Sequence, residues 1–136
     1  MNIRLILTLS LLGLLVAFGS IAGLIPAGWE TAVWAVIVLV CANVLARRAP
    51  GKFFLHGFLT GFIAGAVSLL CHALFMTQYL AHNAKADAGF KALPAGMSPA
   101  LVVVLLSPFF GGLLGVVTGL LTWGWARFTR PKPAVA

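Results

Sequence analysis

One long apolar stretch in the middle of the chain, residues 53–83, limits the fold more than any other feature. It contains no Lys, Arg, Asp or Glu, and a helix of about 20 apolar residues is long enough to cross a bilayer. A helix also satisfies its backbone hydrogen bonds internally, which the hydrocarbon core of a membrane requires. The stretch therefore predicts a membrane-spanning helix.

Three further apolar runs accompany this stretch, and the four expected spans cover residues 5–25, 29–46, 53–81 and 99–128. Hydrophobic residues make up 62% of the 136 residues and charged residues only 8%, which is too few to cover a soluble domain. Pro108 is expected to bend the last helix, because proline cannot donate a hydrogen bond to Val104. The loop after Asn83 is expected to hold a short interfacial helix that ends before Pro94. The sequence thus predicts one all-α membrane domain, a four-helix bundle.

The basic residues lie at the ends of the apolar runs, which favours a role in membrane topology over nucleic-acid binding. Two of the nine, Lys85 and Lys91, are expected on one side of the membrane. The other seven are expected on the opposite side: Arg4, Arg47, Arg48, Lys52, Arg127, Arg130 and Lys132. Since an excess of Lys and Arg marks the cytoplasmic side, we expect both termini in the cytoplasm and an up-down-up-down bundle. The imbalance argues against a dual-topology dimer.

Glycine recurs at every fourth position on the third and fourth expected spans. The two groups are Gly57, Gly61 and Gly65, and Gly111, Gly115 and Gly119. Each group lies on one face of its helix, and such small residues let helices approach closely in lipid. These six are therefore expected to be helix-packing residues, either between the two spans of one chain or between neighbouring subunits.

His72 is the most informative polar residue. On a helical wheel it shares a face with Gly65, Ser68 and Tyr79, and ionisable groups inside a membrane often mark functional sites. A neutral imidazole there is suited to relay protons, to hold a quinone headgroup, or to ligate haem or chlorophyll. The structural alternative is a histidine that bonds to a neighbouring carbonyl or hydroxyl. His56 is expected on the apolar face, so a haem with two histidine ligands from this chain is not expected.

Glu30 is the only acid within or near an expected span. Its expected depth lies within about one turn of His72, so the two residues form a candidate ligand or proton site. A carboxylate at a helix start is also favoured by the helix dipole, which gives Glu30 a structural interpretation as well.

Enzymatic activity is not expected. The sequence shows no nucleophile with a base, no cluster of metal ligands and no phosphate-binding loop, so neither catalytic residues nor a metal site are expected. Cys41 and Cys71 are expected at depths that differ by roughly 12 Å, which is too far for a disulfide within one chain.

The second half of the chain carries a set of Gly, Pro and Phe motifs. Phe53 and Gly57 open a span, Asn83 closes it, and the loop and last span contain Phe90, Leu93, Pro94 and the run SPFFGGLLG at residues 107–115. In these features the chain resembles uncharacterised four-span bacterial inner-membrane proteins of unknown function. The resemblance covers residues 53–115 and implies a bacterial inner membrane, without implying an activity.

Three functions are compatible with these features. The first is a non-catalytic accessory or scaffolding subunit, which contacts membrane lipids and packs through its glycine faces against other transmembrane subunits or a second copy of itself. The second is a homo-oligomeric channel or transporter for a small solute or proton, using His72 and Glu30. The third is a subunit that binds a pigment or haem through His72; apart from that case, no cofactor is expected.

Overall fold

Four apolar helical stretches long enough to cross a membrane form the body of the protein. The computed structural model describes residues 1–26 and 28–129. The four stretches are Ile3–Ile21, Glu30–Arg48, Phe53–Leu74 and Pro99–Thr129, and the described residues contain no strand. The prediction of an all-α protein with four membrane-length helices is therefore confirmed.

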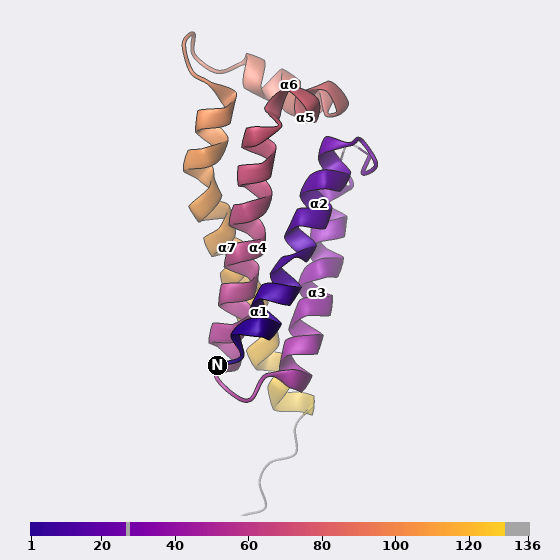
Figure 1. Ribbon diagram of the computed structural model, residues 1–136, viewed down its shortest axis with the longest axis vertical. Coiled ribbons are helices and arrows are strands. Elements are labelled where there is room, and N and C mark those ends of the chain that lie inside the picture. Colours follow the sequence, from indigo (N-terminus) through magenta and orange to yellow (C-terminus); the bar gives the residue numbers. More distant parts are fainter. Residues whose placement is uncertain (27, 130–136) are drawn as a thin grey trace, which may run out of the picture.

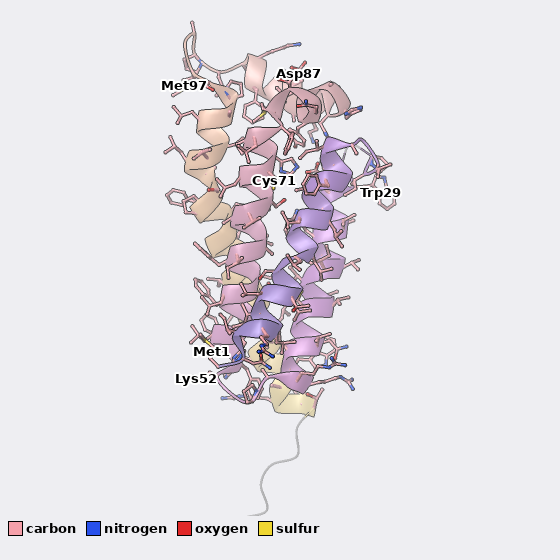
Figure 2. All side chains as sticks on the ribbon, in the orientation of Figure 1. Met1, Trp29, Lys52, Cys71, Asp87 and Met97 are labelled. Atoms are coloured by element: carbon pink, nitrogen blue, oxygen red, sulfur yellow. The ribbon has the colours of Figure 1, made fainter. Side chains whose placement is uncertain are left out.

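Seven helical elements make up these stretches and their connections. They are α1 (Ile3–Ser10), α2 (Leu12–Ile21), α3 (Glu30–Arg48), α4 (Phe53–Leu74), α5 (Met76–His82), α6 (Ala84–Lys91) and α7 (Pro99–Thr129). Successive long helices run in opposite directions in Figure 1. Figure 2 places Met1 and Lys52 at one end of the bundle and Asp87 and Met97 at the other. The short helix expected before Pro94 is present as α6.

The third span is shorter than the sequence predicts. We expected it to reach residue 81, but α4 ends at Leu74, and α5 lies across the end of the bundle (Figure 1). Phe75, between the two helices, packs against Phe18 of α2 with 6.2 Å between ring centroids. His82 Nδ1 donates to the carbonyl of Ile21 at 3.0 Å and so satisfies one of the terminal carbonyls of α2. Tertiary contacts end α4 here, and no Gly or Pro marks the break.

The other span boundaries differ by a few residues. The first span ends at Ile21 rather than at residue 25, because Gly23 takes a left-handed φ of 71° and ends the helix. Its N–H donates to the carbonyl of Ser20 at 3.1 Å. The second span runs to Arg48 rather than to residue 46, and the fourth to Thr129 rather than to residue 128.

α4 lies between α1 and α2 on one side and α7 on another (Figure 1). On the first side Gly13 sits directly against the backbone of Ala64, and Ser10 Oγ donates to the carbonyl of Thr60 at 3.2 Å. α4 is therefore the central helix, and more than one of its faces is covered by protein.

On the second side, the glycines of α4 and α7 face each other in an antiparallel register. A Cβ added to Gly57 would lie 2.8 Å from the Cα of Gly119, and one added to Gly65 would lie 3.0 Å from the Cα of Gly111. Any larger residue would push the two backbones apart. Close approach of this kind is how helices gain packing contacts in lipid.

The middle glycines of the two groups complete this contact. A Cβ at Gly61 would lie 2.5 Å from the carbonyl oxygen of Leu114, and one at Gly115 would lie 2.7 Å from that of Phe58. All six glycines are buried. The two glycine faces therefore pack against each other within one chain, and neither is left open to a second subunit.

Pro108 lies inside α7 without ending it. A residue other than proline at this position would donate its N–H to the carbonyl of Val104. Ser107 supplies a replacement, because its Oγ donates to that carbonyl at 2.8 Å. The helix thus keeps this carbonyl paired within the protein, as the hydrocarbon core of a membrane requires.

Replacing Ser107 with alanine is expected to lower the free energy of unfolding by about 1 kcal/mol, because it leaves the Val104 carbonyl unpaired. Replacing Pro108 with alanine in the same variant restores a backbone donor and should recover that loss. Thermal unfolding of the purified variants in one detergent measures both effects. An equal loss from Ser107→Ala with proline or alanine at position 108 would show that the hydroxyl does not replace the missing donor.

Candidate functional site

A cavity of about 280 Å³ lies among α3, α4 and α7, at the end of the bundle covered by α5 and α6. α3 and α7 diverge toward this end (Figure 1). The cavity is lined by Glu30, Thr31, Trp34, Ser68, Leu69, His72, Tyr79, Phe90, Val103, Leu106 and Phe110. The two residues that the sequence singled out as a ligand or proton site, Glu30 and His72, are thus brought to one cavity.

His72 has no hydrogen bonds that would explain it as a structural residue. Its side chain is only 5% exposed, and neither ring nitrogen makes a hydrogen bond of normal length and angle among the described residues, although the backbone of Ser68 interacts weakly with the ring. Ser68, one turn earlier on α4, is also buried and its Oγ is also unpartnered. Leaving a buried donor or acceptor unpaired costs about 1–3 kcal/mol. Such groups call for a specific partner, which an ordered water, an ion or a bound ligand can supply.

The ring of Tyr79, on α5, lies against the imidazole of His72, with 4.3 Å between centroids and 56° between ring planes. Burial, together with the negative charge of Glu30, raises the pKa of Tyr79 to about 12. Tyr79 is therefore a neutral phenol at physiological pH. Among the residues that line the cavity, Glu30 is the only one with an acidic side chain.

His56, which the sequence places on the apolar face of the helix, is buried like His72 but differs in its hydrogen bonds. It is 0% exposed, because α1 covers that face of α4. The backbone N–H of Asn2 donates to Nε2 of His56 at 2.9 Å, so Nδ1 carries the proton and donates to the carbonyl of Lys52 at 3.1 Å. Both nitrogens are used, which makes His56 a structural residue.

Glu30 is held by Ser20, near the end of α2. Ser20 Oγ donates to Oε1 of Glu30, and the side-chain amide of Asn83 donates to the Ser20 carbonyl at 3.3 Å. Oε2 of Glu30 has no partner among the described residues. Among the described residues, the one ion pair joins Lys91 to Asp87 at 2.6 Å. The carboxylate of Glu30 therefore has a fixed position but no cationic partner among those residues.

A second cavity of about 340 Å³ adjoins the first at the end of the bundle. Glu30, Thr31 and Tyr79 line both cavities, and Gly28, Asn83, Lys85 and Ala86 complete the second. The shared residues make Glu30 and Tyr79 the boundary between an inner site at His72 and the outer surface of the bundle.

The helical wheel grouped Ser68 and His72 correctly, whereas Tyr79 reaches His72 from the separate helix α5. The wheel also missed two aromatic residues on other helices. Trp34 of α3 and Phe110 of α7 form one wall, with 5.7 Å between centroids and an edge-to-face angle of 80°. Their sequence positions carry no signal of this contact, because it depends on how α3 and α7 pack.

No group of three or more His, Cys, Asp or Glu side chains among the described residues is placed to hold a metal ion. Cys41 and Cys71 are free thiols.

No protein-family model, curated protein or solved structure matches this chain.

Proposed function

We propose that this chain is a multi-pass membrane protein that binds a small solute in the cavity beside His72, as the binding site of a channel or carrier. One observation carries the proposal. The imidazole of His72 and the hydroxyl of Ser68 are buried, lack partners and line one cavity together with a carboxylate. A site of this kind, mostly apolar with a few convergent polar groups, is typical of small-molecule binding.

The orientation of the chain across the membrane, and the identity of that membrane, are also proposals. Arg47 and Arg48 end α3 at the end of the bundle opposite the cavity, and an excess of basic residues marks the cytoplasmic side. Arg130 and Lys132, which contribute to that excess, lie outside the described residues. We place both termini in the cytoplasm of a bacterium, the membrane being the inner one as the family resemblance implies. The cavity then opens on the outer side.

An accessory or scaffolding subunit is the second candidate function. The glycine faces of α4 and α7 are occupied by each other, so a partner subunit or a second copy would need another surface. A shallow apolar cavity of about 290 Å³ on α7 offers one, lined by Leu120, Leu121, Gly124, Trp125 and Phe128. An added Cβ at Gly124 would meet no atom within 4 Å, which leaves room for a neighbouring helix.

A pigment or haem at His72 is less favoured than a smaller solute. The ring of Tyr79 already lies against the imidazole, and His56, the other buried histidine of α4, uses both nitrogens within the fold. The visible absorption spectrum of the purified protein tests this alternative.

Cysteine labelling tests whether the cavity is open to the outer solution. In a chain with Cys41 and Cys71 replaced by alanine, Leu69→Cys places a thiol in the cavity, and Leu70→Cys places one at nearly the same depth on the exposed apolar side. A membrane-impermeant thiol reagent added outside should label position 69 at least about tenfold faster, because thiolates form in water and not in hydrocarbon. Equal rates at the two positions would reject an outward-open cavity.

A further inference from the structure

The residues around the cavity also indicate the chemical class of the solute. We propose that it is a primary ammonium compound with an apolar body, an inference that rests on the proposed function. Three features of the site support this class: its charge, its hydrogen-bonding groups and its aromatic walls.

The charge of the cavity favours a cation. Glu30 contributes a carboxylate, and no Lys or Arg is among the lining residues. Lys85, the nearest basic residue on the path outward, lines only the adjoining outer cavity and makes no ion pair with Glu30. Glu30 is the first residue of α3 and is half-buried, so its carboxylate is accessible from the cavity. A cationic solute would supply the partner that the described residues do not.

The hydrogen-bonding groups match an ammonium rather than a quaternary amine. An –NH₃⁺ group has three donors and no acceptor. Three acceptor atoms in the cavity are not used within the described residues: Oε2 of Glu30, Oγ of Ser68 and one ring nitrogen of neutral His72. An ammonium would pair Oγ of Ser68 and the acceptor nitrogen of His72 but not the ring N–H, whereas a quaternary amine would satisfy the charge of Glu30 and leave all of these groups unpaired.

The walls are suited to the rest of such a molecule. Aromatic side chains from four helices, Trp34, Tyr79, Phe90 and Phe110, line the cavity together with Leu69, Val103 and Leu106. Aromatic faces attract cations, and the apolar groups bury a hydrocarbon body. A volume of about 280 Å³ lies just below the range of pockets for drug-sized ligands, which limits the solute to a small one.

Calorimetric titration of the full chain in detergent with three related compounds, against protein-free micelles, tests this inference. At pH 7 we expect 2-phenylethylamine to bind at least about tenfold more tightly than 2-phenylethanol, which has the same body and no charge. The N,N,N-trimethyl derivative, charged but without N–H donors, should fall between them. This comparison uses the unaltered chain, so it does not depend on how any variant folds.

The two acids of the chain provide a matched pair of variants. Glu30→Gln keeps an acceptor for Ser20 and should weaken amine binding about tenfold and abolish the preference over the alcohol. Asp87→Asn, outside both cavities, should change amine affinity by less than about twofold. Equally tight binding of amine and alcohol would overturn the ammonium assignment and leave the proposed solute site in place. Absence of binding by all three compounds would also overturn the assignment, while labelling at position 69 decides separately whether the site is open.

Discussion

Replacing Gly115 with leucine is expected to destabilise the protein severely, whereas the same change at Gly112 should leave it almost unchanged. Both residues lie on α7, but a Cβ at Gly115 would sit 2.7 Å from the carbonyl oxygen of Phe58, while one at Gly112 would meet no atom within 4 Å. Overpacking of this kind typically costs 1–3 kcal/mol. Because a backbone carbonyl on α4 cannot move aside like a side chain, we expect the upper end of that range, about 3 kcal/mol.

Melting temperatures of the two variants in the same detergent measure this difference, with yield of monodisperse protein as a second readout. Gly61→Leu, on the opposite helix, should behave like Gly115→Leu, because its Cβ would meet the carbonyl of Leu114. If Gly112→Leu proved as damaging as Gly115→Leu, the close contact between α4 and α7 would not be what the glycines provide.

The sequence was sufficient to predict four spans and which helix faces carry small residues, but not where the third span ends or what those faces contact. A period of four residues places Gly57, Gly61 and Gly65 on one side of α4 without specifying a partner. The partner is set by register: Gly57 meets Gly119 and Gly65 meets Gly111 only because α4 and α7 run antiparallel. Whether such a contact forms within a chain or between chains depends on tertiary packing.

In the candidate site, the helical wheel correctly grouped residues that lie on the same helix. It placed Ser68 and His72 on one face of α4, and depth alone brought Glu30 near them. It could not show what surrounds His56, which lies roughly 160° from His72 at 100° per residue. Asn2 and α1 cover that face, and this covering by a distant segment leaves no periodic signal in α4.

Replacing His56 and His72 with leucine is expected to have opposite consequences. Leucine at position 56 removes two hydrogen bonds and leaves the N–H of Asn2 without its partner, while the carbonyl of Lys52 still accepts from the backbone N–H of residue 56. This should cost about 1–3 kcal/mol. Leucine at position 72 removes two polar atoms that have no partner, so the gain of about 1–3 kcal/mol should at least offset the lost contact with Tyr79, worth about 0.5–1.5 kcal/mol.

The same two variants should affect solute binding in the opposite way: His72→Leu strongly and His56→Leu little. His72→Leu is expected to abolish binding of a solute that donates to the imidazole, although the variant remains folded. His56→Leu, when folded, should retain the cavity, because its side chain does not line it. A stable protein without ligand binding is the outcome expected when a residue serves function at some expense of stability.

The melting temperature of His72→Leu, measured beside the unaltered chain and His56→Leu in one detergent without added solute, tests most directly whether His72 is kept for a ligand rather than for the fold. We expect no decrease, or a small increase, for His72→Leu and a clear decrease for His56→Leu. A decrease for His72→Leu as large as that for His56→Leu would mean that the imidazole supports the bundle, and would contradict a ligand site at this position.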